Sequence, residues 1–161
     1  MSGLLGRKNV VQIAFVVENI EDACRNFSRL LGTEAGPITD AGDYCVIRTV
    51  LDGAPAPDTN CRMAFLQAGN GVTIELIQPN GAPSVWQEHL EQKGPGFHHI
   101  AFCVDDMDAA IAQYGKAGFP LRQQGRYRDD SGAYAYLDAR DTLHMYIELL
   151  TQDRKEQEHA F

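Results

Sequence analysis

The chain has 161 residues, of which 44% are hydrophobic and 22% are charged, and its formal net charge is −8 at pH 7. This composition is typical of an ordinary globular protein, built as one compact domain or as two small, mutually dependent modules. No apolar run approaches the ~18 residues that cross a bilayer, and no cluster of Lys and Arg indicates a nucleic-acid surface. We therefore expect neither a membrane nor a nucleic acid as a partner.

Cysteine usage and the first residues favour a cytoplasmic protein. The four cysteines show no C-x-x-C spacing, so a zinc site of the cysteine type is not expected. Residues 1–9 lack a long apolar core followed by a cleavage-type end, so we expect no signal peptide. A reduced cytoplasmic protein is the natural interpretation, and a secreted protein with two disulfides is the alternative.

The first predicted elements are a strand and a helix. Residues 10–17 are typical of a short, mostly buried strand. Apolar residues then recur at helical spacing over residues 20–31, which predicts an amphipathic helix. Asn19 or Glu18 can cap its start, and Gly32 can end it in the left-handed conformation.

Three further strands complete the first half, which gives it the order β-α-β-β-β. We expect a strand at residues 44–51 and a hairpin formed by residues 61–67 and 71–78. The loop between them, residues 52–60, contains two prolines and is therefore excluded from the interior of a sheet.

A linker rich in Gly and Pro follows, with a short helix at residues 84–92 that Ser84 can cap. The second half then repeats the order of the first. Its expected elements are a strand at 97–104, a helix at 107–117 capped by Asp105 or Asp106, a strand at 121–127, and a closing hairpin of 133–138 and 143–150. The resulting divisions are an extension at 1–9, a first module at 10–79, a linker at 80–95, a second module at 96–150 and a polar tail at 151–161.

The two halves are copies of one unit. Gln12-Ile13-Ala14-Phe15 matches His99-Ile100-Ala101-Phe102 at a spacing of 87 residues, and the same spacing aligns the two helices. Both halves end in a strand that contains Ile-Glu-Leu, at residues 74–76 and 147–149. The sequence therefore predicts a duplicated α+β fold of two tandem βαβββ modules.

Polar residues of both copies fall on one face of the expected sheet. Because strand side chains alternate, Gln12 and His99 share one face, and Glu75 and Glu148 lie opposite the apolar residues of their strands. Two helices can cover only the apolar face, so the other face forms a trough that holds these four residues. The neighbouring His98 is expected to point away from His99.

These four residues predict a metal site. A carboxylate inside a trough is costly unless it is paired or bound to a metal. Two carboxylates, an imidazole and an amide oxygen suit one divalent ion that prefers mixed nitrogen and oxygen ligands, such as Zn²⁺, Ni²⁺, Co²⁺, Mn²⁺ or Fe²⁺. Taken singly, each side chain has an ordinary alternative role, a solvent-facing acid or a hydrogen-bonded histidine. Their equivalent places in a duplicated unit favour the metal.

Four further residues are candidate substrate contacts. His144 and Tyr146 are expected on the face of Glu148, with a satisfied hydrogen-bonding pair as the alternative. Arg48 and Arg126 could bind a phosphate or carboxylate, although exposed surface arginines are the more common case.

The stretch at residues 96–110, GFHHIAFCVDDMDAA, resembles the vicinal oxygen chelate superfamily, the glyoxalase, bleomycin-resistance and dioxygenase group. It is most similar to methylmalonyl-CoA epimerases. The resemblance implies βαβββ modules whose mostly antiparallel sheets curve into a cup around one metal, with helices on the outer face. It also implies one metal ligand from each first strand and each last strand, and a homodimer.

Some residues depart from the epimerase pattern. Methylmalonyl-CoA epimerases usually have His where this chain has Gln12, and Gln where it has Glu75. The set found here, Gln12, Glu75, His99 and Glu148, resembles that of some glyoxalase I enzymes.

The resemblance implies a metal-dependent isomerase or lyase. It would move a proton alpha to the carbonyl of a small carbonyl compound or thioester, through a metal-stabilised enolate. Glu148 is the expected base and Glu75 the second choice. One alternative is an iron dioxygenase, which needs two histidines and one carboxylate, so that His98 or His144 would have to replace Gln12. The other is a metal-free ligand-binding or resistance protein of the same fold.

Overall fold

The structure is a computed structural model that describes residues 3–4, 6 and 9–153. Its strands are β1 (Val10–Val16), β2 (Thr39–Asp40), β3 (Val50–Leu51), β4 (Ala54–Pro55), β5 (Cys61–Gly69), β6 (Val72–Pro79), β7 (Gly96–Cys103), β8 (Leu121–Arg126), β9 (Gly132–Ala139) and β10 (Met145–Gln152). Its helices are α1 (Ile20–Leu31), α2 (Tyr44–Ile47), α3 (Val85–Lys93), α4 (Met107–Lys116) and α5 (Arg140–Leu143). Among these, no helix combines the length and the apolar character that crossing a bilayer requires.

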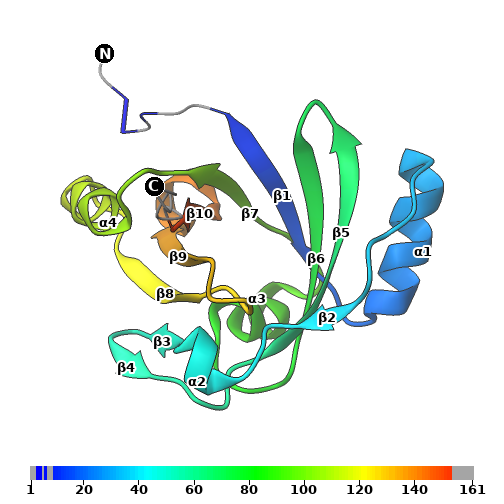
Figure 1. The fold of residues 1–161 in the computed structure, drawn as a ribbon, viewed down its shortest axis with the longest axis horizontal. Coiled ribbons are helices and arrows are strands. Elements are labelled where there is room, and N and C mark those ends of the chain that lie inside the picture. Colours follow the sequence, from blue (N-terminus) through cyan, green and yellow to red (C-terminus); the bar gives the residue numbers. More distant parts are fainter. Residues whose placement is uncertain (1–2, 5, 7–8, 154–161) are drawn as a thin grey trace, which may run out of the picture.

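The strands form one curved sheet in the order β2-β5-β6-β1-β7-β10-β9-β8-β3-β4 (Figure 1). Within each half the first strand lies parallel to the last, β1 beside β6 and β7 beside β10. The two halves meet through the antiparallel pair of β1 and β7, and the other neighbours are antiparallel too. The predicted α+β class, with a curved and mostly antiparallel sheet, is confirmed.

Capping side chains define where the two long helices begin. Asn19 accepts a hydrogen bond from the Asp22 backbone N–H at 2.9 Å, and Asp106 accepts one from that of Ala109 at 3.0 Å. Gly32 ends α1 with a φ of 67°, a conformation that costs a glycine little. These predicted helix boundaries are confirmed.

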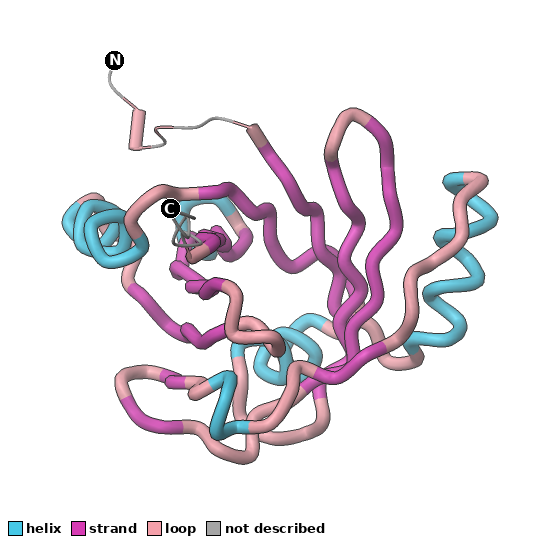
Figure 2. Tube along the Cα trace, in the orientation of Figure 1, coloured by secondary structure: helices cyan, strands magenta, loops and turns pink. Residues whose placement is uncertain are grey.

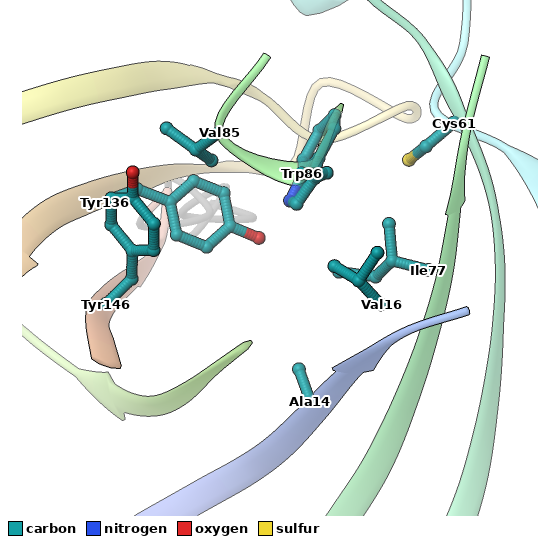
Figure 3. Close-up of a cluster of buried hydrophobic side chains, with 8 residues drawn as sticks. All are labelled: Ala14, Val16, Cys61, Ile77, Val85, Trp86, Tyr136 and Tyr146. Atoms are coloured by element: carbon teal, nitrogen blue, oxygen red, sulfur yellow. The ribbon is translucent and has the colours of Figure 1, made fainter. Parts of the chain in front are cut away.

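The helices lie on both faces of the sheet. α1 packs on the outer face against β5 and β6, and α4 packs on the outer face against β9 and β10 (Figure 2). α3, from the linker, lies on the concave side and contacts β6, β1 and β7. Its Trp86 is buried among side chains from both halves of the sheet (Figure 3). The linker is thus a wall of the cup as well as a connection between the halves.

The strand predicted at residues 44–51 is wrong over most of its length. Residues 44–47 form the short helix α2, and Arg48 follows in the left-handed conformation with a φ of 46°. The helical turn buries Ile47, which lines a cavity described below, so tertiary packing overrides the local preference for a strand. Only β3 remains of the prediction, and it pairs with β8 of the second half.

The last strand begins two residues later than predicted, which moves His144 out of the sheet. α5 occupies residues 140–143, and His144 ends it with a φ of 59°. The carboxylate of Asp138 accepts a hydrogen bond from the Arg140 backbone N–H at 3.0 Å and stabilises this turn. The prediction that His144 shares the face of Glu148 is therefore wrong. β10 continues to Gln152, and the predicted tail from residue 154 onward lies outside the described residues.

Close packing at the start of β9 generates a stability prediction. A Cβ atom on Gly132 would lie 2.1 Å from the Thr151 carbonyl oxygen and 2.5 Å from the Tyr127 ring. We expect Gly132→Ala to lower the free energy of unfolding by about 1–3 kcal/mol, because the backbone of β10 must move. Gly115→Ala is the matched control, since it adds a methyl group to open space in α4 and should stabilise by up to ~1 kcal/mol. Urea unfolding of both variants measures the difference, and equal effects would contradict it.

Candidate metal centre

Three buried side chains, from three of the four central strands, converge on one point. His99 Nε2 on β7 lies 3.0 Å from Glu148 Oε2 on β10 and 3.3 Å from Glu75 Oε2 on β6. The ligand atoms of the three residues all lie within 4.8 Å of one another. This spacing is small enough for one ion to contact all three.

The strand register places small residues next to the three polar side chains, which leaves space around them. Ala14 on β1 is paired with both Glu75 and His99, and its copy Ala101 on β7 is paired with Glu148. Paired residues share a face of the sheet, so two methyl groups lie beneath three long polar side chains. The duplicated alanines therefore keep the base of the site open.

Hydrogen bonding among these groups is incomplete in a way that suits a cation. Glu75 Oε2, His99 Nε2 and Glu148 Oε2 are all buried, and none has a partner with hydrogen-bond geometry. Leaving such buried atoms unsatisfied costs about 1–3 kcal/mol for each group, and more for charged ones. One divalent ion would satisfy all three, since mixed nitrogen and oxygen ligands suit the ions expected from the sequence. The residues present therefore fit a metal.

The electrostatics of the metal-free group favour protonation. Burial lowers the pKa of His99, but the attraction of Glu148 and Glu75 outweighs it and raises that pKa to about 9. Burial, with the nearby Glu148 carboxylate, raises the pKa of Glu75 despite its contact with His99. Protons and a metal ion therefore compete for the same atoms.

A β-bulge lies directly before Gln12 in β1 and directly before His99 in β7, the predicted metal ligands of the two first strands. The extra residue is Val11 in β1 and His98 in β7, and these are equivalent positions of the two copies. A bulge interrupts the alternation of side chains and re-aims them. The prediction that His98 points away from His99 is therefore wrong: the Nδ1 atoms of the two rings lie 2.9 Å apart.

The group opens into a cavity of about 460 Å³ on the concave face. Gln12 lines this cavity together with Glu75 and Glu148, and its contact with an ion stays a prediction. Five aromatic side chains, from both halves and from α3, are part of its walls: Phe65, Trp86, Tyr127, Tyr134 and Tyr136. Such a wall limits the access of water to the base of the cavity.

The mouth of the cavity is charged, and its arginines are paired. Arg126 lines the cavity and forms ion pairs with Asp130, at 2.7 Å, and with Asp153. Arg128 forms an ion pair with Asp40 at 2.7 Å, which joins the β8–β9 turn to the opposite end of the sheet. Trp86 and this ion pair belong to the cavity without having been predicted there, because the linker and the β2 region gave no repeat signal.

The remaining candidate contacts lie elsewhere. Arg48 is exposed and its guanidinium lies 3.4 Å from the Asp130 carboxylate. His144 is exposed at the end of α5. Tyr146 is buried on the concave side, where its ring stacks on His98 with centroids 4.8 Å apart. The structure thus brings Tyr146 close to the metal-directed group and leaves His144 and Arg48 at the surface.

The sequence matches the profile of a known superfamily. The family profile of the Glyoxalase/Bleomycin resistance protein/Dioxygenase superfamily matches residues 11–137. The chain therefore belongs to this superfamily, and the resemblance seen at residues 96–110 is confirmed.

Its similar proteins include several epimerases. The ethylmalonyl-CoA/methylmalonyl-CoA epimerase of Cereibacter sphaeroides is 34% identical over 117 residues, which cover 71% of this chain and 73% of that protein. The human mitochondrial methylmalonyl-CoA epimerase is 30% identical over 113 residues, 70% of this chain, and the match spans only 54% of that protein. The 2-epi-5-epi-valiolone epimerase of an Actinomyces species is 29% identical over 126 residues, 76% of this chain and 66% of that protein.

Solved structures show the same fold. The methylmalonyl-CoA epimerase of Mycobacterium tuberculosis has a TM-score of 0.65 at 20% identity, covering 93% of this chain and 94% of that one. A variant of the Streptomyces coelicolor methylmalonyl-CoA epimerase, in complex with 2-nitronate-propionyl-CoA, has a TM-score of 0.62 at 18% identity, covering 90% of this chain and 97% of that one.

Metal uptake is expected to release protons. At pH 7, below the pKa of about 9, His99 holds a proton in the metal-free protein, and an ion must displace it. Binding of one Zn²⁺ or Ni²⁺ per chain should release about one proton and, at a free ion concentration 100 times Kd, stabilise the fold by about 2.7 kcal/mol. The number of protons should fall as the pH rises through 9. Titration calorimetry in two buffers of different ionisation enthalpy measures it.

His99→Leu is the control for this prediction, since it removes the imidazole and keeps a buried side chain. It should lose both the stabilisation and the proton release. A wild-type protein that takes up none of the divalent ions Zn²⁺, Ni²⁺, Co²⁺, Mn²⁺ and Fe²⁺ would contradict the prediction.

Proposed function

We propose that the protein is a divalent-metal-dependent epimerase or related isomerase. It moves a proton on the carbon next to the carbonyl of a small carbonyl compound or thioester. The observation that carries this proposal is the set of three buried, unpartnered ligand atoms beside an open cavity that Glu75 and Glu148 line. The epimerase names of similar proteins support the same class of reaction. When bound, the ion supplies Lewis-acid stabilisation of the negative charge that develops on the substrate oxygen.

Two carboxylates placed on opposite sides of His99 suit epimerisation. Glu75 comes from β6 and Glu148 from β10, the outer pair of the four central strands. Inversion of a carbon centre requires a proton to leave from one face and return to the other, and one acid on each side of His99 would serve the two faces. We assign proton removal to Glu148 and proton return to Glu75, the two carboxylates that contact His99 from the strands on its two sides.

The cavity adds orientation and exclusion of water to this chemistry. Its aromatic wall holds an apolar acyl group, while Gln12 and the two carboxylates line the polar base. For a CoA thioester, the acyl part would occupy the cavity and the remainder would leave through the mouth beside Arg126 and Arg128. A methylmalonyl-CoA epimerase of the same fold has a CoA derivative bound, which supports a thioester as the first substrate to test. A homodimer stays a prediction.

The alternative of an iron dioxygenase is less well supported. That chemistry needs two histidines and one carboxylate around the metal. Within the described residues, the Nε2 atom of His99 is the one imidazole nitrogen in the group, because His98 is hydrogen-bonded to His99 and His144 lies exposed. A metal-free binding protein is distinguished by elemental analysis, since it would carry no stoichiometric metal.

Replacing the carboxylate of Glu148, the proposed base, tests the assignment. Glu148→Gln keeps an oxygen ligand but cannot accept a proton, so exchange of the substrate α-proton with deuterated solvent should fall by roughly 10²–10⁴-fold. Incubation with methylmalonyl-CoA in D₂O, followed by mass spectrometry, measures the exchange, and elemental analysis checks that the metal is retained. Glu91→Gln, an exposed acid on α3, is the control and should exchange at the wild-type rate. Full exchange by Glu148→Gln would remove Glu148 from the role.

Glu75→Gln separates the two acids. If Glu75 returns the proton on the second face, this variant should keep exchange on one stereoisomer and lose interconversion of the two. Starting from each stereoisomer in turn distinguishes this outcome from a general loss of activity.

A further inference from the structure

His98 is a buried, polar residue that is neither one of the predicted metal ligands nor one of the two proposed catalytic acids. Its side chain is 1% exposed and lies among aromatic rings. It stacks on Tyr146 and meets Tyr136 and His89 edge-on, at centroid distances of 4.8, 5.6 and 5.2 Å. The ring is therefore held in one orientation.

One end of the His98 ring faces a group that can only accept a hydrogen bond. Its Nε2 atom lies 3.2 Å from the backbone carbonyl oxygen of Val85, the first residue of α3. A carbonyl oxygen has no proton to give, so His98 Nε2 must carry the hydrogen. In the neutral ring, Nδ1 of His98 is then an acceptor.

The other end of the ring faces His99. The two Nδ1 atoms lie 2.9 Å apart, a distance that requires one hydrogen between them. Because Nδ1 of His98 is the acceptor, Nδ1 of His99 must be the donor. Turning the His98 ring by half a revolution would put carbon atoms at both contacts and leave buried groups unsatisfied, which costs about 1–3 kcal/mol each.

The consequence falls on Nε2 of His99. When an ion displaces the extra proton of His99, the neutral imidazole keeps one hydrogen, and the contact with His98 holds that hydrogen on Nδ1, so Nε2 is the atom that presents a lone pair. That atom is the one that lies 3.0 Å from Glu148 and 3.3 Å from Glu75. We propose that His98 is a positioning residue that fixes the tautomer and orientation of His99, so that Nε2 is always the atom offered to a divalent cation.

This inference rests on the proposed function only in assuming that the site takes a cation. It also links the site to the linker. The backbone N–H of Val85 donates to the buried Gln123 side chain at 3.0 Å, so the residue that orients His98 is itself held by β8. The orientation of His99 thus depends on three segments: the bulge in β7, the start of α3 and the middle of β8.

Two substitutions at His98 separate its hydrogen bond from its bulk. His98→Phe keeps an aromatic ring against Tyr146 but has no acceptor, and it should weaken Zn²⁺ binding by roughly 10–100-fold. His98→Asn offers an oxygen at the δ position and should restore binding to within a few-fold of wild type. His89→Phe alters the packing on the other side of His98 without touching His99, and it should leave the affinity unchanged. Competition with a chromophoric zinc chelator measures all four proteins.

Nitrogen-15 NMR of the histidine side chains gives a readout that packing alone does not move. In the zinc-loaded wild type, His98 should be neutral with its hydrogen on Nε2, and His99 should carry its hydrogen on Nδ1. In His98→Phe, the chemical shift of the Nδ1 hydrogen of His99 should move away from the value typical of a hydrogen-bonded N–H. If His98→Phe does not fold, the wild-type spectrum alone decides.

Two results would overturn the positioning role: a hydrogen on Nδ1 of His98, or full zinc affinity in a folded His98→Phe variant. A wild-type protein that binds none of Zn²⁺, Ni²⁺, Co²⁺, Mn²⁺ and Fe²⁺ would overturn it together with the proposed function. If the tautomers and affinities are as expected but no α-proton exchange is found with any carbonyl substrate, the proposed function fails and the role of His98 stands.

Discussion

Glu75 and Glu148 are two carboxylates buried beside one imidazole nitrogen, and the rest of the structure must offset the repulsion between them. Like charges at this separation repel each other, and burial removes the water that would screen them. The surrounding sheet must therefore be rigid enough to keep Glu75 and Glu148 in place, and something positive must be able to lie between them. The four central strands provide the rigidity, because each acid is on a strand with a hydrogen-bonded neighbour on both sides. A proton on His99 or a divalent ion provides the charge.

Duplication explains how such a site can arise, and the departures from symmetry explain how it works. Both copies supply an acid from the last strand, an alanine beneath the group and a bulge before the metal-directed residue. The copies differ at two positions near the group. The first strand offers the amide of Gln12 and the second offers the imidazole of His99, and the bulged residue is Val11 in one and His98 in the other. Symmetric acids around an asymmetric centre suit a reaction that treats two faces of one carbon alike.

Much of this arrangement could be predicted from the sequence because it follows from local rules. The repeat at a spacing of 87 residues gave the pairing of the copies, and strand alternation placed Glu75, His99 and Glu148 on a common face. Residues 44–47 could not be predicted in the same way, because the contact that bends them into α2 is the burial of Ile47 against the cavity. The role of His98 was hidden by the bulge, which breaks the alternation on which the prediction relied. One signal was available: a histidine stands where the other copy has a valine.

The location of α3 has a consequence for how the two halves came to share a chain. A segment that merely tethered two preformed modules could be lengthened or cut at little cost. Here Trp86 forms part of the interior surface, and the Val85 backbone helps to orient the histidine pair. Two separate polypeptides, one for each half and without the linker, would reproduce the sheet but lack the part of the cavity wall that α3 supplies. Fusion of the two halves thus contributed part of the cavity wall itself, and insertions into that junction would alter the cavity as directly as changes to a central strand.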